Sequence, residues 1–209
     1  MSEQFYSQFG EDSWIASNFS LPEKGTFAEI GAFDGKLCSN TLWLENRGWM
    51  GYCVEPDPLM AAEARKNRKC PVLSCAISST LPLPHTYLLV NKADRGMSGL
   101  AVEKFDARVP VIAMRFEDVQ EIMGFPHLTV ASVDTEGTEI DVLSTLTVSD
   151  GWPSILIVEF LTMPSPPRDD AIRSFMPSHM VQVYKSPANL IFYNTMATDV
   201  SWLGPTIKR

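Results

Sequence analysis

The sequence has no long apolar run and comparatively few basic residues. No segment reaches about 18 uninterrupted apolar residues, the length that a membrane-spanning helix needs, and the first residues lack the basic start and apolar stretch of a secretory leader. Lysine and arginine together number 17, against 25 aspartates and glutamates, which gives a formal net charge of −8. A broad basic face for nucleic acid is therefore disfavoured. We expect a cytoplasmic protein whose partners include neither membranes nor nucleic acids.

Cysteine is scarce, and its spacing does not indicate a metal. The four cysteines are Cys38, Cys53, Cys70 and Cys75, and no two of them form a C-x-x-C pair. The sequence therefore disfavours a structural zinc site. Because all four lie in or near predicted strands, we expect small, buried apolar side chains in a reducing compartment.

The length and apolar content of the chain fit one folded unit. Its 209 residues are 45% hydrophobic, which is enough for one well-buried α/β core and too little for two. We expect a single domain over residues 1–209. The same brevity fits a domain of a larger glycan-building protein.

A glycine turn after a buried strand is the most informative stretch. Residues 27–35 (FAEIGAFDG) form an apolar run that ends in Gly31 and Gly35. Glycine allows positive φ and a close backbone approach to a ligand, and the turn feeds a predicted helix for which Ser39 is an N-cap candidate. Glu29 stands just before the turn, where a carboxylate suits a cationic or hydroxylated ligand. The sequence therefore predicts a ligand site at this turn.

The second predicted strand, residues 50–54, ends in Glu55 and Pro56. Glu55 follows Gly35 by 20 positions. A Rossmann-like fold places the acid that binds two ribose hydroxyls at about this spacing and at the end of the second strand. Glu55 is therefore the predicted ribose ligand.

A third strand is predicted over residues 72–78, where Ala76 and Ile77 would lie against an adenine ring. Further along, residues 91–99 form a loop rich in asparagine, aspartate, arginine and glycine. Loops of this length in compact domains often cover a substrate. We expect this loop to act as a lid or a substrate loop.

Two further strands end in acidic residues. The apolar run 128–133 is followed by Asp134, and the run 154–158 by Glu159. Parallel strands end at the ligand edge of such a sheet, so both carboxylates are expected in the crevice of the glycine turn. Asp134 is the leading catalytic candidate. Glu139 is expected in the first turn of the next helix, where it interacts with the helix dipole.

The two ends of the chain also carry information. Residues 5–15 mix aromatic and polar side chains, and this pattern predicts a loop and a short helix that either pack on the sheet edge or cover a cofactor. Near the other end, residues 180–184 and 189–193 predict a hairpin. A short hairpin at the end of a parallel sheet makes the last strand antiparallel.

In this order, the motifs resemble the FkbM family of class I S-adenosylmethionine-dependent methyltransferases. The segments that carry the resemblance are 6–12 (YSQFGED), 29–35 (EIGAFDG) with 39–41 (SNT), 55–58 (EPDP) and 134–139 (DTEGTE). The resemblance implies an α/β, Rossmann-like fold with a seven-stranded, mostly parallel sheet, one antiparallel strand and helices on both faces. It also implies O-methylation of a hydroxyl on a small molecule, polyketide or sugar.

The resemblance further implies which residues bind S-adenosylmethionine. The methionine part would lie by the glycine turn, the ribose by Glu55, and the adenine by the third strand. The opening segment, residues 1–25, would close over the cofactor. The full implied set is Tyr6, Gln8, Glu11, Glu29, Gly31, Gly35, Ser39, Glu55, Pro56, Ala76, Ile77 and Asp134. Phe33 stands where many class I members have a second glycine, a difference that the FkbM type tolerates.

Two routes to an activated acceptor hydroxyl stay open. Asp134 or Glu159 acts as a general base, or the two carboxylates hold Mg²⁺ or Mn²⁺, which binds the acceptor and lowers its pKa. We favour the metal, because two strand-end acids in an oxygen-rich site suit a hard cation. The expected acceptor is a deoxyhexose hydroxyl of a glycan, and a polyketide or another small molecule stays open.

Two other classes of protein share part of the pattern. An NAD-binding dehydrogenase has the glycine turn and the ribose acid, but it would be expected to carry G-x-G-x-x-G, and Asp34 would repel a pyrophosphate. A binding module without activity would keep the fold alone. The intact acids Glu29, Glu55 and Asp134 count against that alternative.

Overall fold

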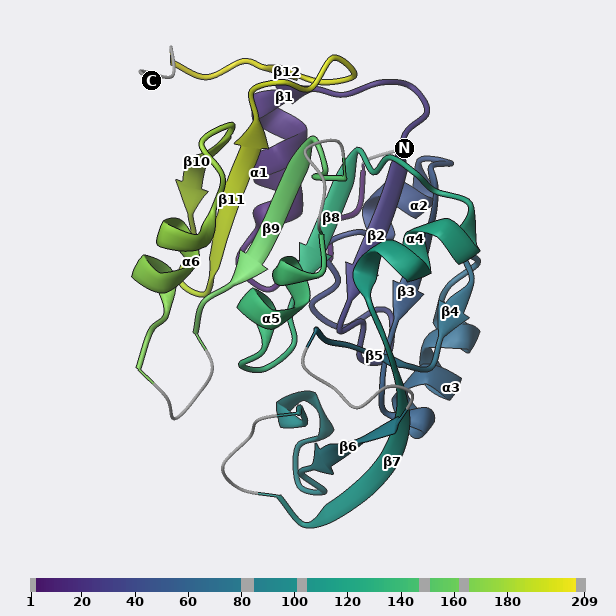
Figure 1. Ribbon diagram of the computed structural model, residues 1–209. Helices are drawn as coiled ribbons and strands as arrows, with labels where there is room; N and C mark the ends of the chain where they lie inside the picture. The colour runs from purple at the N-terminus through teal and green to yellow at the C-terminus, as the bar shows by residue number, and fades with distance from the viewer. Residues whose placement is uncertain (1–2, 80–84, 101–104, 147–150, 162–165, 206–209) are drawn as a thin grey trace.

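The computed structural model of the protein describes residues 3–79, 85–100, 105–146, 151–161 and 166–205. Its largest sheet has seven strands in the spatial order β10, β11, β9, β8, β2, β3, β4 (Figure 1). In chain order these strands are β2 (Thr26–Ile30), β3 (Met50–Val54), β4 (Val72–Leu73), β8 (Val130–Val133), β9 (Ile155–Glu159), β10 (Met180–Lys185) and β11 (Asn189–Asn194). The strand order reverses between β2 and β8, and in such sheets ligands bind at the carboxyl ends beside this reversal.

One strand of this sheet runs against the others. β11 pairs antiparallel with both β9 and β10, whereas the pairs β2–β3, β2–β8, β3–β4 and β8–β9 are parallel. The central strand β8 is buried at every position, as expected of a parallel strand covered on both faces. The predicted seven-stranded, mostly parallel sheet with one antiparallel strand is therefore confirmed.

Helices cover both faces of the sheet, as predicted (Figure 1). The helices of one face are α1 (Glu11–Asn18), α2 (Leu42–Asn46) and α3 (Pro58–Asn67). The helices of the other face are α4 (Phe116–Met123), α5 (Glu139–Ser144) and α6 (Asp169–Phe175). Successive side chains of a strand point to opposite faces, so Phe27 packs in the core under α1 and α2 while Ala28 packs in the core under α4 to α6.

A three-stranded sheet extends from the carboxyl ends of the main strands (Figure 1). Its strands are β5 (Ala76–Ile77), β6 (His85–Val90) and β7 (Ala107–Met114), and the 3₁₀ turn η1 (Arg95–Met97) follows β6. The prediction of one strand over residues 72–78 is therefore wrong. Val72 and Leu73 pair with β3, whereas Ala76 and Ile77 pair with β7, a partner that the local pattern does not reveal.

A two-stranded sheet, β1 (Phe19–Ser20) with β12 (Ser201–Trp202), lies at the opposite end of the main sheet (Figure 1). The two strands pair antiparallel. Trp14 stacks on Tyr184 of β10 with ring centroids 4.3 Å apart, so the predicted opening helix packs on the sheet edge. Residues 1 and 2 of the predicted covering segment lie outside the described residues. Within the described ranges, no helix has both the length and the apolar character needed to cross a membrane.

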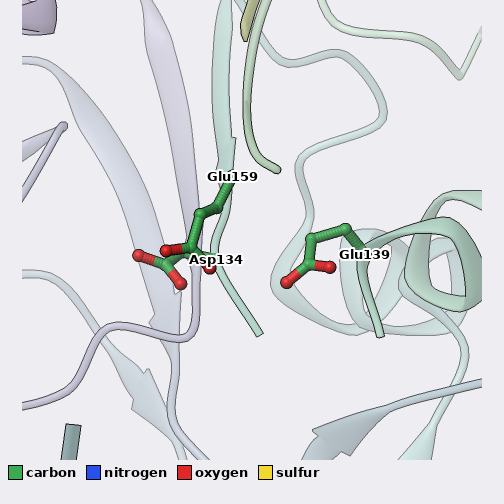
Figure 2. A group of neighbouring side chains, drawn as sticks. All are labelled: Asp134, Glu139 and Glu159. Atoms are coloured by element: carbon green, nitrogen blue, oxygen red, sulfur yellow. The ribbon is translucent and has the colours of Figure 1, made fainter. Parts of the chain in front are cut away.

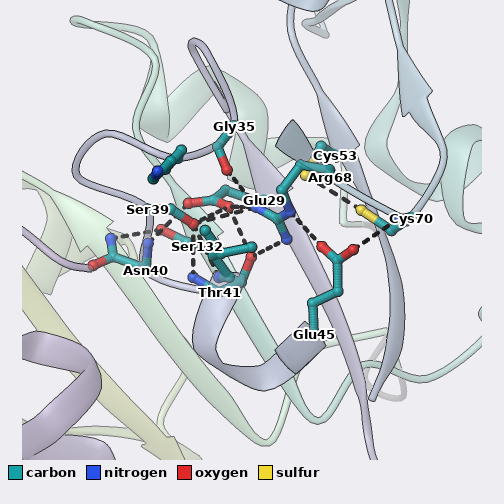
Figure 3. A network of polar contacts seen from close by, with 12 residues as sticks. Glu29, Gly35, Ser39, Asn40, Thr41, Glu45, Cys53, Arg68, Cys70 and Ser132 are labelled. Carbon is teal, nitrogen blue, oxygen red and sulfur yellow. Dashed lines mark hydrogen bonds and ion pairs between the residues drawn. The ribbon is translucent and has the colours of Figure 1, made fainter. Parts of the chain in front are cut away.

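A buried polar network joins β2 to the two helices that follow it (Figure 3). The side chain of Arg68, at the C-terminal end of α3, is fully buried, and its Nη1 lies 2.6 Å from Oε2 of Glu29. Its Nε donates to Glu45 of α2, and its Nη2 donates to Oγ1 of Thr41 at 3.0 Å. One guanidinium therefore bridges two buried carboxylates on different elements.

The same network fixes the glycine turn. Arg68 Nη1 also donates to the carbonyl of Gly35 at 3.3 Å. Gly35 has a φ of +79°, and a Cβ at this position would lie 2.8 Å from Cγ of Arg68 and 3.0 Å from Cα of Ala64. The turn therefore needs glycine here both for its conformation and for its contact with α3.

We predict that Arg68→Met lowers the free energy of unfolding by about 3–5 kcal/mol, because it leaves two buried carboxylates without their cation. Urea unfolding followed by circular dichroism measures the change. The control is Lys66→Met of α3, whose ammonium is exposed and pairs with Glu63. We expect the control to stay within about 0.5 kcal/mol of the wild type, and equal effects of the two variants would contradict the prediction.

Candidate functional site

One cavity of about 420 Å³ lies at the carboxyl ends of β2, β3, β8 and β9. The loop from Asp94 to Leu100, which contains η1, forms its opposite wall. The sequence-predicted residues that line this cavity are Gln8, Glu29, Gly31, Glu55, Pro56, Ala76, Ile77, Asp134 and Glu159. The structure therefore brings residues from four strand ends into one site. Tyr6, Glu11, Gly35 and Ser39 are not among the lining residues.

The glycine turn lies in close contact with the end of β8. Gly31 has a φ of +83°, and a Cβ built on it would lie 1.6 Å from the carbonyl oxygen of Asp134. Any side chain at this position would therefore push the turn away from β8. Phe33 also has a positive φ, of +50°, and its N–H donates to Oε2 of Glu55 at 2.7 Å. Phe33 thus adopts the backbone conformation of the glycine that many class I members have there.

Glu55 joins the turn to the end of β3. One carboxylate oxygen accepts from the N–H of Phe33, and the other accepts from the N–H of Asp57 at 2.8 Å. Burial raises the pKa of Glu55 to about 8, although these two N–H groups favour the ionised form. A carboxylate has about four acceptor sites, so Glu55 keeps acceptor capacity for a ligand in the cavity.

Glu29 and Ser39 support the site from behind. The carboxylate of Glu29 accepts from Oγ of Ser39, Oγ1 of Thr41, the N–H of Asn40 and the guanidinium of Arg68. Ser39 Oγ also accepts from the N–H of Leu42 at 3.0 Å, but the N-cap of α2 is Thr41, so the prediction of Ser39 as the N-cap is wrong. Both polar groups are therefore used within the chain, and Glu29 contributes to the cavity as part of its wall.

The opening segment reaches the cavity through Gln8. Glu11 is buried, and its Oε1 accepts from Oγ of Ser186 and from Nδ2 of Asn189 at 2.8 Å. The hydroxyl of Tyr6 accepts from Nδ2 of Asn46 at 3.2 Å. These two contacts fix the segment to the β10–β11 turn and to α2. Of the three side chains predicted to close the site, Gln8 alone is among the lining residues.

Asp134 and Glu159 lie side by side at the edge of the cavity (Figure 2). Their carboxyl groups form a hydrogen bond with each other, which requires a shared proton. Burial raises the pKa of both groups, and the negative charge of Asp134 raises that of Glu159 further. One Glu159 oxygen, Oε2, is buried and has no hydrogen-bond partner among the described residues. The pair therefore holds one proton and one negative charge.

Glu139 faces this pair from the start of α5 (Figure 2). Its Oε1 accepts from the N–H groups of Thr135 and Gly137, both at 3.0 Å, and its Oε2 lies 2.7 Å from Nη1 of Arg168. The first interaction is the predicted first-turn role. In addition, one oxygen each from Asp134, Glu139 and Glu159 lie within 4.8 Å of one another, a donor set that could hold a metal ion.

Two features of the cavity escape the sequence analysis. Glu136 has a φ of +53°, and burial raises its pKa to about 8. It lies inside the 134–139 motif, for which the sequence analysis assigns a role to Asp134 and to Glu139 but none to Glu136. Nη2 of Arg95 lies 2.5 Å from Oδ2 of Asp57, so the predicted lid loop is joined to the residue that caps α3. No local pattern indicates that pairing.

The cysteines differ from one another in exposure. Cys53 and Cys75 are buried, as predicted, and Cys70 is half-buried. Cys38 is exposed and lines the cavity, so the prediction of a buried residue is wrong there. Its φ of +59° and its place in the turn before α2 explain the difference, because this turn faces the ligand crevice instead of the core.

The sheet order, the antiparallel β11, the glycine turn and the strand-end acids around one cavity define the class I methyltransferase fold. The chain belongs to the FkbM methyltransferase family, because residues 29–183 match the family model for the methyltransferase FkbM domain. A search of curated proteins finds no significant match.

Solved structures resemble the chain at low sequence identity. The chain is similar to a chain of the fibrillarin/Nop5p complex, with a TM-score of 0.51, 11% identity, and coverage of 90% of this chain and 81% of the other. The likeness to a putative methyltransferase, yhhF, from Escherichia coli has a TM-score of 0.45 and 11% identity over 87% and 82% of the two chains. At these identities the fibrillarin likeness speaks for the fold alone.

We predict that Glu159→Gln removes a pH dependence of stability in metal-free buffer. Glu159 is ionised in the unfolded chain above its usual pKa of about 4.3 but stays protonated in the fold, so the wild type loses stability as the pH rises. The glutamine keeps a donor for Asp134 and does not titrate. At pH 8 we expect the variant to be more stable by about 1–2 kcal/mol, with no advantage at pH 4.

Urea unfolding at a series of pH values measures this effect. Glu63→Gln, an exposed glutamate of α3, is the control and should follow the wild type at each pH. If Glu159→Gln keeps the slope of the wild type, the shared proton is not present.

Proposed function

We propose that the protein is an S-adenosylmethionine-dependent O-methyltransferase that acts on a hydroxyl group of a sugar. This proposal rests on one observation: the glycine turn, Glu55 and the carboxyl groups of Asp134 and Glu159 all line the same cavity. The first two features suit the cofactor, and the third suits activation of a hydroxyl. An acidic wall also suits a positively charged sulfonium better than a pyrophosphate.

The residues present fit S-adenosylmethionine part by part. Gly31 and Glu29 line the cavity at the glycine turn, where the methionine part would lie. Glu55 retains acceptor sites for two ribose hydroxyls, and Ala76 and Ile77 offer an apolar surface for adenine. When bound, S-adenosylmethionine supplies a methyl group on a positively charged sulfur atom. Gln8 would then cover the methionine end.

The carboxylate pair would prepare the acceptor. A hydroxyl is a weak nucleophile until it loses its proton, and methyl transfer requires it to lie in line with the methyl group. The ionised member of the pair, Asp134, can accept that proton, while Glu159 keeps the pair's own proton. The buried Oε2 of Glu159 can accept a hydrogen bond from a neighbouring hydroxyl of the sugar.

The same carboxylates also fit Mg²⁺ or Mn²⁺, and we propose that such an ion activates the acceptor hydroxyl. Asp134 and Glu159 would hold the ion, and Glu139 can supply a third oxygen. The unpartnered Oε2 of Glu159 and an all-oxygen donor set suit a hard cation. Such an ion would lower the pKa of the acceptor hydroxyl. The pair would give up its shared proton to bind it.

A sugar acceptor is favoured by the polar edge of the cavity. The carboxyl groups of Asp134, Glu136 and Glu159 line it there, and hydroxyl groups are donors that such acceptors bind. We propose a deoxyhexose residue of a glycan. Arg95 does not add a free cation to the acceptor side, because it is paired with Asp57. A polyketide hydroxyl is the second candidate.

We predict micromolar binding of S-adenosylmethionine and no binding of NAD in calorimetric titrations. Glu55→Ala removes the ribose acid and should weaken cofactor binding at least about tenfold, equivalent to about 1.4 kcal/mol. Glu63→Ala on the exposed face of α3 is the control and should bind as the wild type does. Thermal unfolding shows whether each variant is folded. Binding of NAD, or of neither ligand, would overturn the proposed cofactor.

We further predict methyl transfer to methyl glycosides of deoxyhexoses, measured with a labelled methyl group. Asp134→Asn should lower kcat about 100-fold or more with little change in KM for the sugar, since it removes the ionised member of the pair. Asp170→Asn, whose carboxylate is 97% exposed on α6, is the control.

The same assay with a chelator distinguishes the two routes. Activity that is lost with the chelator and restored by Mg²⁺ or Mn²⁺ supports the metal, and activity that persists supports Asp134 as a base. Methylation of polyketide hydroxyls in place of glycosides would overturn the sugar assignment.

A further inference from the structure

Cys53 of β3 and Cys70, two residues beyond Arg68, lie side by side with their Sγ atoms 3.7 Å apart (Figure 3). The backbone holds both residues in place. The N–H of Cys53 donates to the carbonyl of Pro71 at 2.9 Å, and the N–H of Cys70 donates to Oε1 of Glu45 at 3.0 Å. The backbone thus places the two thiols side by side, and a disulfide needs their sulfur atoms to approach from 3.7 Å to about 2.05 Å.

The two thiols differ in access to solvent. Cys70 is half-buried, whereas Cys53 is fully buried. The hydrogen bond to Cys70 raises the pKa of Cys53, and burial raises it further. A reagent from solution therefore meets Cys70 first, and Cys53 stands directly behind it. A solvent-accessible thiol next to a second, resolving thiol is a common arrangement in reversible thiol oxidation.

We propose that Cys53 and Cys70 form a site of reversible oxidation by a low-molecular-weight disulfide of the glutathione type. The Cys70 thiolate attacks one sulfur of the reagent, forms a mixed disulfide and releases one thiolate. Cys53 Sγ then attacks Sγ of Cys70, and the Cys53 proton passes to the departing sulfur, so that the second half of the reagent leaves as a thiol. Two protein thiols are oxidised, and one reagent disulfide is reduced to two thiols.

This site goes beyond methyl transfer and does not depend on it. The chain between the two cysteines includes Glu55, Asp57 and all of α3. A Cys53–Cys70 disulfide would close this segment into a covalent loop and restrict its unfolded state. The oxidised form should therefore unfold at a higher temperature than the reduced form, and β3 should stay joined to the end of α3.

The test uses the full chain with Cys38→Ser, which removes the exposed thiol. The reduced protein is incubated with glutathione disulfide, and intact mass spectrometry detects the products. We expect loss of two hydrogen atoms, with little protein left carrying glutathione, and a rise in Tm of several degrees. Dithiothreitol should reverse both changes.

Two further variants locate the bond. Cys38→Ser/Cys70→Ser should neither lose two hydrogen atoms nor gain glutathione, because the remaining thiols are buried. Cys38→Ser/Cys75→Ser should behave as Cys38→Ser does, which excludes a bond to Cys75. Protein that stops at the glutathione adduct, that does not react while folded, or that forms the bond without Cys70 would each overturn the proposal.

Discussion

The buried cation of Arg68 is the constraint on which the ligand end of this fold depends. Its guanidinium bonds to Glu29 at the end of β2, to Glu45 of α2 and to the carbonyl of Gly35 in the turn between them. Two buried carboxylates near one another would repel and lose hydration without it. With it, they orient the turn and its preceding strand. The cavity above the turn thus has a floor shaped by charged groups that are paired within the chain.

The acids around this floor divide into two groups by their partners. Glu29 and Glu55 accept hydrogen bonds from the chain, and these bonds shape the turn. Asp134 and Glu159 lie against each other, and they reduce their repulsion by sharing a proton. The first group gives the site its form. Asp134 and Glu159 can still bind a ligand, because their shared proton can dissociate, whereas Arg68 stays paired with Glu29.

Strand ends could be predicted from the sequence, whereas contacts between distant segments could not. Glu55, Asp134 and Glu159 each end an apolar run, so parallel strands had to bring them to one edge. The burial of Arg68 could not be predicted, because an arginine at the end of a helix looks the same in the sequence whether its side chain is exposed or buried. Residues 72–78 look like one strand because the change of partner from β3 to β7 is not visible locally. Glu11 was expected to face the cofactor, but Ser186 and Asn189, far along the chain, hold it elsewhere.

The contact between Gly31 and the Asp134 carbonyl sets a distance between the two halves of the site. With no Cβ between them, the glycine turn and the acid pair are spaced by backbone atoms on neighbouring strands. The facing wall comes from the loop after β6, outside the main sheet. A substitution in that loop can therefore reshape the facing wall of the cavity, while the spacing between the glycine turn and the acid pair stays constant.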